Sequence, residues 1–546
     1  MAKRIHPKYI FVVGGVMSSV GKGVTAASIG RILQSKGLRV TAVKADPYIN
    51  VDAGTMNPTE HGEVFVTEDR DETDQDIGNY ERFLNANIYS VNYMTTGRVY
   101  DTVIRKERNL EYKGACVEVV PHIPEEIISR IQAAQRESKA DVTIIEVGGT
   151  VGEYQNILFL EAARMMRTRY PDDVCFMLVS YLPIPERVGE MKTKPTQSAA
   201  RTLNAAGIQT DFIIARAAHA LDRKRQEKLA IFCGIPTDHA ISAPDIDMIY
   251  KLPQVLEKQQ LGDKLLKQLK LKPRRTQMQN WNTMVARAVH STRELRIAVV
   301  GKYFGTGDYT LSDSYISVIE ALKHAAWAQH RKPVLTWIDS EAYEKHPSKA
   351  VELKRYDGVI VPGGFGTRGV EGIIKAIQYV RKQKIPYLGL CYGMQLAMIE
   401  IARHEAGLKQ ANTVEMAPYA KHPIIHINPK QSENIKLNRY GGTMRLGAFR
   451  CKLKPGTKAY QAYGRNEISE RHRHRYEFNN NYRVALEKAG VVFSGMNPDQ
   501  DLVEIAEYKP HPWFVGTQFH PEFKSRPLEP HPLYLAFVKA CIKASK

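Results

Sequence analysis

The stretch Tyr9-Ile-Phe-Val-Val-Gly-Gly15-Val-Met-Ser-Ser-Val-Gly21-Lys22-Gly23 decides the fold of the first half of this 546-residue chain. An apolar, β-branched run enters a glycine-rich loop that ends in a lysine, and a helical run over residues 27–34 follows. This order is typical of a phosphate-binding loop, whose backbone amides and helix amino end cradle an anion. The spacing is unusual, because five residues separate Gly15 from Gly21 and Gly23 stands where a hydroxyl residue is common. The alternative, a purely structural glycine turn, leaves Gly-Lys-Gly at the start of a helix unexplained.

Strand-like and helix-like runs alternate in both halves of the chain, on either side of a basic, polar stretch. Near-continuous apolar strands that alternate with helices are typical of parallel sheets with helices on both faces. We therefore predict an α/β protein with two doubly wound parallel-sheet domains: a P-loop-like domain over residues 1–270 and a second over 295–546, joined by a linker over 271–294. The strand-like runs are residues 38–43, 142–147, 174–180 and 211–215 in the first half, and 296–301, 358–361 and 385–390 in the second.

The composition is that of an ordinary globular protein, with 43% hydrophobic and 25% charged residues. No apolar stretch reaches the roughly 20 residues that a membrane-spanning helix needs, and no signal-cleavage pattern follows the basic start. Six scattered cysteines do not suggest a disulfide framework, so we expect a reducing, cytoplasmic setting. The net charge of +19 favours anionic ligands such as nucleotides, but the basic residues are scattered, which does not favour nucleic-acid binding.

A second glycine-flanked turn, Gly389-Leu-Cys391-Tyr-Gly393, follows an apolar strand-like run and precedes a helical run over residues 394–404. This pattern is typical of a nucleophile elbow, which exposes its side chain at the amino end of a helix and favours the thiolate form of a cysteine. Downstream, His520 is a candidate base for the thiol, and Glu522 is a candidate partner that orients the imidazole. The glycine loop over residues 361–366 is a candidate oxyanion hole.

Carboxylates beside the phosphate loop predict a magnesium site. Glu146 ends a strand-like run and precedes Gly148-Gly149-Thr150, so we expect it at the carboxyl edge of the sheet. The acidic segment 68–76 is expected to supply a second carboxylate, and the residues alone leave open which of its acids serves. Mg²⁺ beside nucleotide phosphates is typically held by one or two carboxylates and water.

Several longer motifs resemble the cytidine triphosphate (CTP) synthase family over nearly the whole chain. The motifs that carry the resemblance are residues 14–23, 46–58, 61–69, 192–197 and 441–447. The second domain by itself resembles class I glutamine amidotransferases, whose Cys–His–Glu triad falls on Cys391, His520 and Glu522. The resemblance implies an amino-terminal amidoligase (synthetase) domain followed by a class I glutaminase domain.

The resemblance implies a ligase that makes CTP from UTP, ATP and L-glutamine in two sites. In the first domain, ATP phosphorylates the 4-oxygen of UTP. In the second, Cys391 attacks the glutamine amide, a thioester forms with release of ammonia, and water hydrolyses the thioester to glutamate. The ammonia passes through the protein to the first site and displaces phosphate, with Mg²⁺ as the metal cofactor.

The resemblance also assigns ligand contacts to individual residues. For ATP these are Ser19, Val20, Gly21, Lys22, Gly23, Val24, Lys44, Asp76, Pro244, Asp245 and Ile246, and for Mg²⁺ they are Asp76 and Glu146. For UTP and CTP they are Ser18, Lys192, Thr193, Lys194, Pro195, Thr196, Gln197 and Lys228. For glutamine they are Gly364, Tyr392, Gly393, Met394, Gln395, Glu415 and Arg475.

Regulation and assembly follow from the resemblance alone. Inhibitory CTP is assigned to Glu153, Tyr154 and Gln155, where this chain departs from the family's acidic pair: Gln155 replaces the second acid, and Glu153 replaces the usual aspartate. Tyr392 stands where relatives often have leucine, a change of little consequence if only its backbone amide serves. Activation by GTP, CTP feedback inhibition and a homotetramer complete the family's pattern.

Two other functions compete with this interpretation. Another glutamine-dependent amidoligase, such as a cobyrinate amidase, activates a carboxylate, and residues 46–58 and 192–197 argue against it because they resemble a UTP site. A non-catalytic, basic nucleic-acid-binding or filament-forming protein is suggested by the +19 charge and by the basic run 470–477. The intact residues Lys22, Cys391 and His520 argue against vestigial sites, and the basic run suits a solvated strand end or an anionic small ligand better.

Overall fold

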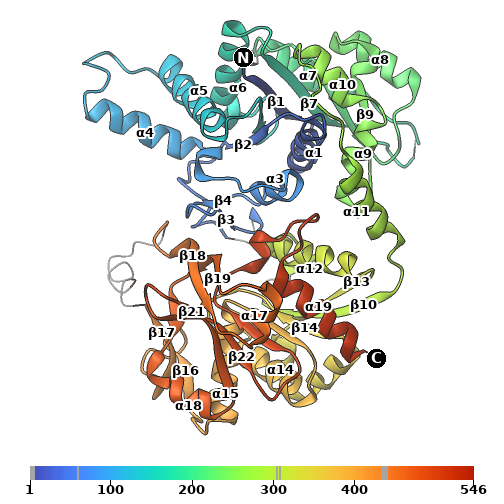
Figure 1. Ribbon diagram of the computed structural model, residues 1–546. Coiled ribbons are helices and arrows are strands. Elements are labelled where there is room, and N and C mark those ends of the chain that lie inside the picture. Colours follow the sequence, from blue (N-terminus) through green and yellow to red (C-terminus); the bar gives the residue numbers. More distant parts are fainter. Residues whose placement is uncertain are drawn as a thin grey trace. The chain divides into compact units, whose positions relative to one another are not determined.

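The computed structural model describes residues 6–57, 61–187, 189–302, 305–306, 309–310, 312–428, 431 and 441–545. Their fold divides into two compact units (Figure 1). Unit 1 holds the described residues of Met1–Asp52 and Asp76–Val285, and unit 2 holds those of Ala53–Gln75 and Ala286–Lys546. The segment 53–75 therefore packs with residues from the second half of the chain. The domain limits predicted at 270 and 295 stay a prediction, and Pro58 of the motif 46–58 lies outside the described residues.

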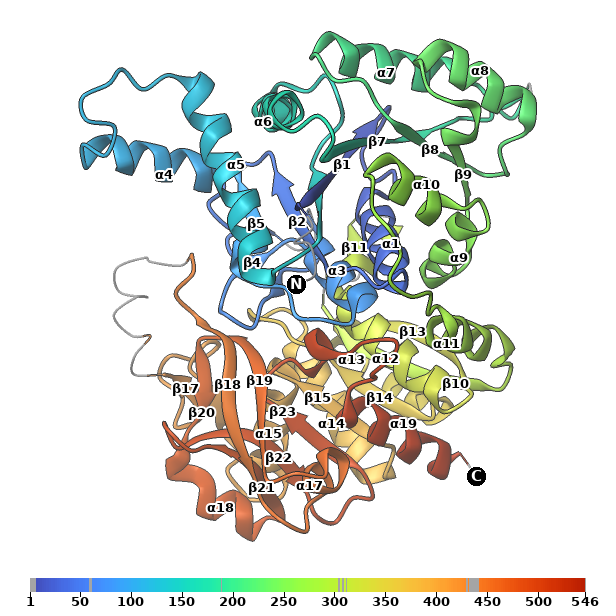
Figure 2. The same ribbon diagram turned by 45° about the horizontal axis from the view of Figure 1, so that its top comes forward.

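Unit 1 is built on a seven-stranded sheet of order β5-β2-β6-β1-β7-β8-β9, in which all neighbours are parallel (Figure 2). The strands are β1 (Lys8–Gly15), β2 (Val40–Asp46), β5 (Tyr93–Thr95), β6 (Val142–Val147), β7 (Val174–Tyr181), β8 (Phe212–Ala217) and β9 (Ala240–Pro244). The helices are α1 (Lys22–Ser35), α3 (Asp76–Leu84), α4 (Thr96–Arg108), α5 (Val119–Ser138), α6 (Ile157–Arg169), α7 (Lys194–Ala205), α8 (Arg223–Cys233), α9 (Leu252–Glu257) and α10 (Leu261–Gln268). A further helix, α11 (Gln279–His290), begins in unit 1 and ends in unit 2.

Both faces of the sheet in unit 1 are buried, which explains why its strands are apolar at every position rather than at alternate ones. On one face, Tyr9, Phe11 and Val13 of β1 share a core with side chains of α5, α6 and α7. On the other face α1 packs so closely that a Cβ added at Gly30 would lie 3.5 Å from Cδ1 of Ile144 on β6. Helices α4 and α5 form a hairpin that projects from the rest of the unit (Figures 1 and 2).

Unit 2 is built on a nine-stranded sheet of order β13-β10-β14-β15-β23-β22-β21-β18-β19. The first five strands are parallel and the last four extend the sheet in antiparallel fashion. The strands are β10 (Glu294–Gly301), β13 (Lys332–Asp339), β14 (Gly358–Val361), β15 (Tyr387–Leu390), β18 (Arg445–Leu453), β19 (Glu467–His474), β21 (Val491–Asn497), β22 (Leu502–Tyr508) and β23 (Phe514–Thr517). Shorter strands form three small sheets: β3 (Phe65–Val66) with β4 (Glu72–Thr73), β11 (Gly305–Thr306) with β12 (Tyr309–Thr310), and β16 (Ala411–Thr413) with β17 (His422–Ile427) and β20 (Tyr476–Phe478).

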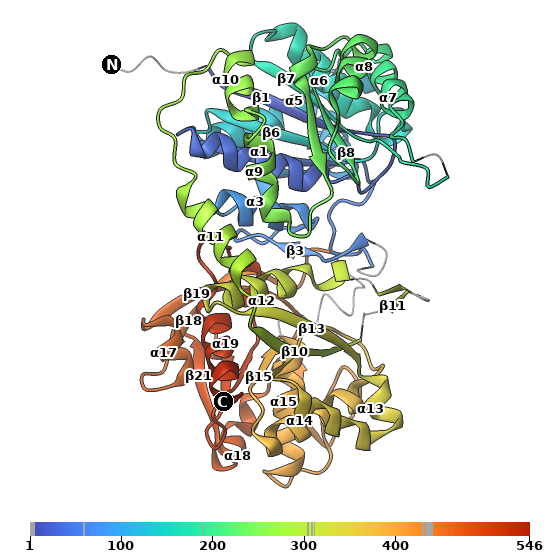
Figure 3. The same cartoon turned by 90° about the vertical axis from the view of Figure 1, so that its right-hand side faces the viewer.

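Helices cover both faces of the large sheet in unit 2, and Figure 3 shows β10 and β13 between α12 and α14. One core joins the sheet to α14 and α15, and a second joins it to α12 and α19. The helices are α12 (Ile316–Ala328), α13 (Glu341–Lys345), α14 (Val370–Gln383), α15 (Tyr392–His404), α17 (Lys458–Tyr463), α18 (Arg483–Lys488) and α19 (Pro532–Ala544). The α/β fold class predicted from the sequence is confirmed. Every helix among the described residues is too short or too polar to span a lipid bilayer.

A buried ion pair between α14 and α15 gives the first prediction. Nε and Nη2 of Arg381 lie 2.7 and 2.9 Å from the two carboxylate oxygens of Glu400, which is fully buried. Arg381→Met leaves that carboxylate without its guanidinium, so we expect unit 2 to lose about 3–5 kcal/mol of unfolding free energy in a denaturant titration. Arg450→Met, which breaks an exposed pair with Glu467, is the matched control and should barely move the midpoint. Equal effects of the two changes would contradict the prediction.

Candidate functional site

Cys391 lies in the tight turn between β15 and α15. Its backbone has φ of 49° and ψ of −99°, a conformation that a non-glycine residue adopts only under strain. The N–H of Cys391 donates to the carbonyl of Thr517 on β23 at 2.6 Å, which fixes the turn to the neighbouring strand. A Cβ at Gly393 would lie 2.3 Å from the carbonyl oxygen of Val361, so only glycine fits there. The backbone therefore has the geometry of a nucleophile elbow.

His520 and Glu522 lie together where the chain leaves β23. Nδ1 of His520 is 2.7 Å from Oε1 of Glu522, and both side chains are buried. Burial by itself lowers the pKa of His520, but the carboxylate of Glu522 and the Cys391 sulfur together raise it to about 10. Nε2 of His520 is buried and has no hydrogen-bond partner among the described residues. A cavity of about 80 Å³ is lined by His520, Cys391 and Gly363, so the imidazole and the thiol open onto the same space.

The glycine loop 362–366 borders this cavity and is held from behind by side chains. The carbonyl of Gly363 accepts a hydrogen bond from the Tyr315 hydroxyl at 3.3 Å. Because N–H and C=O point in opposite directions across a trans peptide, the N–H of Gly364 points away from Tyr315. Lys302 holds the other end of the loop, because its Nζ donates to the carbonyl of Gly366 at 2.6 Å. Burial lowers the pKa of Lys302 to about 8, although the Glu415 carboxylate opposes the shift.

A larger cavity of about 700 Å³ also borders Cys391. Of the residues predicted to bind glutamine, those that line it are Gly364, Tyr392, Gln395, Glu415 and Arg475. The other two do not: Gly393 packs against β14, and Met394 is fully buried against Gly516. Residues 54–57 of the motif compared with a UTP site also line this cavity, within unit 2.

In unit 1 the loop predicted to bind phosphate follows β1 and precedes α1, as the sequence pattern indicates. Val16, Ser19 and Gly21 have φ of 79°, 55° and 88°, so the loop repeatedly enters the left-handed region before α1 begins at Lys22. Nζ of Lys22 donates to the carbonyl of Gly149 at 2.8 Å. Burial lowers the pKa of Lys22, and the Glu146 carboxylate opposes this shift.

Carboxylates surround Lys44 at the carboxyl edge of the same sheet. Nζ of Lys44 lies 2.5 Å from Oδ2 of Asp76, 2.9 Å from Oε1 of Glu146 and 3.7 Å from Oδ1 of Asp46. Burial raises the pKa of Asp46 to about 6, and burial likewise raises that of Glu146. Burial also favours the neutral form of Asp76, but Lys44 outweighs it, so the pKa of Asp76 is lowered.

Two of these carboxylates fit a magnesium ion. Asp76 and Glu146 both contact the ammonium group of Lys44. In the described part of the chain, Oδ2 of Asp46 is buried and has no hydrogen-bond partner. No group of three or more His, Cys, Asp or Glu side chains in that part is arranged to hold a metal ion alone. The donors therefore suit Mg²⁺ that takes its other ligands from phosphates and water.

The residues assigned to nucleotides lie at several places around the phosphate loop. Pro244, Asp245 and the half-buried Ile246 lie at the end of β9 and directly after it. The carboxylate of Asp245 accepts a hydrogen bond from Nη2 of Arg216 at 2.9 Å. Nε of Arg216 lies 3.7 Å from the position of a Cβ on Gly21, so Arg216 stands between that loop and Asp245. Residues 19–24 span the phosphate loop and the first turn of α1, and Ser18 is exposed.

The segment 192–197 leads into α7 beside the end of β1. The hydroxyls of Thr196 and Ser180 lie 2.8 Å apart, and a Cβ at Gly15 would lie 3.3 Å from that of Ser180. Nε2 of Gln197 donates to the Thr193 hydroxyl at 3.0 Å, while Lys194 is exposed and Pro195 half-buried. Lys228, on α8, is exposed. A hydrogen bond from Lys192 and the charge of Lys228 both lower the pKa of Glu190, which places these two lysines near the same carboxylate.

Glu153, Tyr154 and Gln155 follow the carbonyl that Lys22 contacts. Glu153 accepts a hydrogen bond from the Thr150 hydroxyl. Tyr154 is 93% exposed and Gln155 is exposed as well. The three assigned CTP-inhibitory residues thus directly follow the glycine turn 148–152, with Glu153 half-buried and Tyr154 and Gln155 at the surface.

Sequence reasoning missed Asp46, Tyr80 and Arg216 in unit 1, and Lys302, Tyr315 and Gln518 in unit 2. Tyr80 donates to Glu146, and Gln518 contacts Cys391. A local signal exists for Asp46, because it stands three residues beyond the predicted strand 38–43 and two residues after Lys44. Tyr80 and Tyr315 carry no such signal, because their contacts join elements far apart in the sequence.

Comparisons with known proteins agree with both halves of the chain. Residues 8–271 match the family CTP synthase N-terminus, and residues 310–540 match Glutamine amidotransferase class-I. The chain is 51% identical over 540 residues to CTP synthase of Carboxydothermus hydrogenoformans, with 99% of each chain covered. It is 49% identical over 537 residues to CTP synthase of Geobacillus kaustophilus, with 98% of this chain and 99% of that one covered.

A solved structure, the glutaminase domain of Trypanosoma brucei CTPS with bound acivicin, is 35% identical and covers 46% of this chain and 94% of that chain, with a TM-score of 0.42. A synthetase domain followed by a class I glutaminase domain defines a glutamine-dependent amidoligase. The chain belongs to the CTP synthase family, whose members convert UTP to CTP with ATP and glutamine. A cobyrinate-amidase-like ligase and a non-catalytic basic protein are not favoured by these matches.

The raised pKa of His520 gives the second prediction. Because its folded value, about 10, exceeds the ordinary 6.5, the protonated imidazole stabilises the folded state fully below pH 6.5, and this contribution is lost as pH rises from 6.5 through 10. Glu522→Gln removes the carboxylate that raises the pKa, so the imidazole should titrate at a clearly lower pH in an NMR titration. Glu529→Gln, an acid outside the pair, is the control. A His520 titration that stays near pH 10 without Glu522 would refute this origin of the shift.

Proposed function

We propose that Cys391, His520 and Glu522 carry out the glutaminase reaction. The Cys391 sulfur attacks the carboxamide carbon of glutamine, the His520 imidazolium gives a proton to the leaving nitrogen, and ammonia departs as the thioester forms. Water that loses a proton to His520 then opens the thioester to glutamate, and the thiol is restored. Glu522 orients the imidazole. The observation that carries this proposal is the shared cavity of Cys391, His520 and the glycine loop.

The N–H of Gly364 is the candidate donor for the oxyanion of both tetrahedral intermediates, because its peptide is oriented by Tyr315. Of the residues assigned to glutamine, Gly364, Tyr392, Gln395, Glu415 and Arg475 line the larger cavity and are proposed to contact the substrate there, while Gly393 and Met394 form the first turn of α15 behind it. In this set Arg475 and Glu415 are suited to the carboxylate and the ammonium group of the substrate, since they are its charged members that face the cavity.

In unit 1 we propose that the ATP triphosphate lies along residues 19–24, where Lys22 and Lys44 neutralise it. The γ-phosphoryl group passes to the 4-oxygen of UTP, and ammonia then displaces phosphate at C4 to give CTP. Asp76 and Glu146 hold Mg²⁺, which neutralises charge on the phosphates when bound. Adenine is assigned to Pro244, Asp245 and Ile246, and the pyrimidine nucleotide to Ser18, Lys192, Thr193, Lys194, Pro195, Thr196, Gln197 and Lys228.

The functional domains are proposed to be 1–270 for the synthetase, 271–294 for the linker and 295–546 for the glutaminase, with ammonia passing from the second to the first. Feedback inhibition by CTP at Glu153, Tyr154 and Gln155, activation by GTP and a homotetramer are proposed from the family. The exposed Ile104, Leu110 and Val119 on the α4–α5 hairpin offer apolar surface for such an assembly. A cytoplasmic location is proposed because the chemistry needs a reduced Cys391.

Cys391→Ala tests the assignment of glutamine hydrolysis to unit 2 and of CTP formation to unit 1. Glutamine-supported CTP formation should fall by more than about a thousandfold, since the nucleophile is lost. CTP formation from added ammonia, UTP, ATP and Mg²⁺ should persist, because unit 1 is untouched. Cys116→Ala, at an exposed cysteine, is the control and should keep both activities. Loss of the ammonia-supported reaction in Cys391→Ala would overturn the two-site assignment.

The phosphate loop is tested by Lys22→Ala. Both the glutamine-supported and the ammonia-supported reactions should stop, because the buried ammonium group no longer meets the phosphates, while glutamine hydrolysis partly survives. Lys270→Ala, at an exposed lysine of unit 1, serves as the matched control. Undiminished CTP formation by Lys22→Ala would remove this loop from the ATP site.

A further inference from the structure

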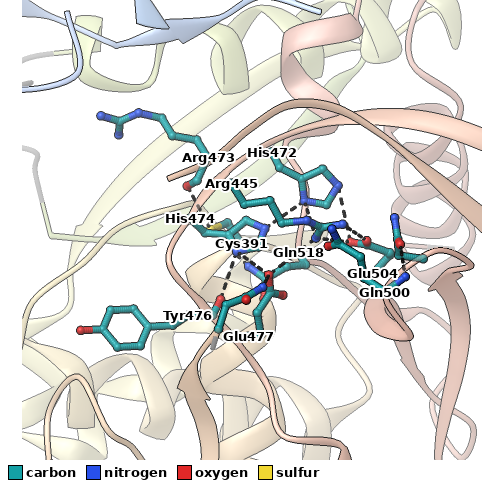
Figure 4. A network of polar contacts seen from close by, with 12 residues as sticks. Cys391, Arg445, His472, Arg473, His474, Tyr476, Glu477, Gln500, Glu504 and Gln518 are labelled. Carbon is teal, nitrogen blue, oxygen red and sulfur yellow. Dashed lines mark hydrogen bonds and ion pairs between the residues drawn. The ribbon is translucent and has the colours of Figure 1, made fainter. Parts of the chain in front are cut away.

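We infer that Gln518 is a positioning residue for Cys391, whose thiolate it stabilises by donating a hydrogen bond from its carboxamide to the sulfur. Gln518 directly follows β23 and is fully buried. Its Nε2 lies 3.6 Å from Sγ of Cys391 (Figure 4). This inference rests on the proposed role of Cys391 as the nucleophile, and it adds a group outside the Cys–His–Glu triad that acts on the thiol.

The orientation of the Gln518 carboxamide follows from its second contact. Oε1 of Gln518 accepts a hydrogen bond from Nε2 of Gln395 at 3.1 Å. Nε2 of Gln395 also donates to the backbone carbonyl of Tyr476 at 3.0 Å, and a backbone carbonyl oxygen can only accept a hydrogen bond. Gln395 therefore presents its NH₂ group, the carbonyl oxygen of Gln518 faces that group, and the NH₂ of Gln518 faces the sulfur.

The backbone holds Gln518 in the same place. Its N–H donates to the carbonyl of Glu504 on β22 at 2.8 Å. The preceding residue, Thr517, accepts the backbone N–H of Cys391. The strand β23, which fixes the elbow through its pairing with β15, thus also delivers the carboxamide, and its other neighbour, β22, holds the backbone of Gln518.

The chemistry of the sulfur explains why this donor matters. A buried thiolate needs donors, and a hydrogen bond to a charged acceptor is stronger than one to a neutral acceptor. The carbonyl of Arg473, 4.0 Å from the sulfur, is an acceptor and favours the neutral thiol instead. Charged groups that share the two cavities with Cys391 are His520, Glu522, Glu63, Glu415, Arg473 and Arg475. His474 also lines the larger cavity, and burial lowers its pKa well below the usual value.

The test measures alkylation of Cys391 by iodoacetamide in the full chain across pH, with the modified peptide quantified by mass spectrometry. Gln518→Leu keeps the volume and removes the donor. The apparent thiol pKa should rise by about one unit, so alkylation at pH values below it should slow about tenfold, with the same plateau at high pH. An unchanged profile in a variant with an unchanged melting transition would overturn the inference.

A second variant reverses the carboxamide without removing it. In Gln395→Glu the new carboxylate accepts a hydrogen bond from Gln518, so Gln518 turns its NH₂ away from the sulfur and its oxygen toward it. The thiol pKa should again rise, although Gln518 is intact. The added negative charge acts by itself too, and the double variant Gln395→Glu with Gln518→Leu isolates that effect. If the two changes are simply additive, Gln395 does not act through Gln518 and the proposed relay is wrong.

The outcomes separate this inference from the proposed function. If Cys391 is not the nucleophile, its alkylation in the unmodified chain is no faster than that of the exposed Cys116, and Cys391→Ala keeps glutamine-supported synthesis. If only the inference fails, Cys391 is the more reactive cysteine and Gln518→Leu leaves its pH profile unchanged. Should Gln518→Leu not fold, the comparison of Gln395→Glu with the unmodified chain decides, and an unchanged profile there refutes the relay.

Discussion

Parallel strands end at the same edge of a sheet, and this constraint builds both sites. In unit 1, Lys44 of β2 and Glu146 of β6 are register partners, so an ammonium and a carboxylate must meet where those strands end. In unit 2, Val361 pairs with Gly389 and Leu390 pairs with Thr517, which places the glycine loop, Cys391 and Gln518 at three adjacent strand ends. Side chains that are more than 120 residues apart therefore meet without any help from local sequence.

Some polar atoms that are buried at these sheet edges make no hydrogen bond within the described part of the protein. Oδ2 of Asp46 in unit 1, and Nε2 of His520 and Oε2 of Glu522 in unit 2, are buried and have no hydrogen-bond partner among the described residues. An unsatisfied buried polar atom costs roughly 1–3 kcal/mol, which folding alone would select against. These three atoms belong to the candidate sites, where a bound substrate, metal or water can complete their hydrogen bonds.

The strands and turns that depend on neighbouring residues could be predicted from the sequence. The side-chain contacts between residues far apart in the sequence could not. The strands 142–147 and 358–361 and the turn around Cys391 follow from apolar runs and flanking glycines, and all are confirmed as elements. Tyr392 shows the limit: only its backbone amide was expected to matter, yet its hydroxyl donates to the carbonyl of Gly366 at 2.8 Å and its ring centroid lies 4.4 Å from Nζ of Lys302. Neither contact can be inferred from the residues next to Tyr392, because Lys302, directly after β10, and Gly366, in the loop after β14, are the partners.

The basic run 470–477 also has partners that lie far from it in the sequence, in the segment 53–75. Its arginines do not form an exposed patch, since Arg471 is fully buried and its Nε lies 2.9 Å from a carboxylate oxygen of Glu68. Arg473 likewise contacts Glu72 at 2.8 Å. Removing the partner of a buried charge costs about 3–5 kcal/mol. The second half of the chain therefore needs residues 53–75 to satisfy its own buried guanidinium group, and that segment brings residues 54–57 to the wall of the cavity beside Cys391.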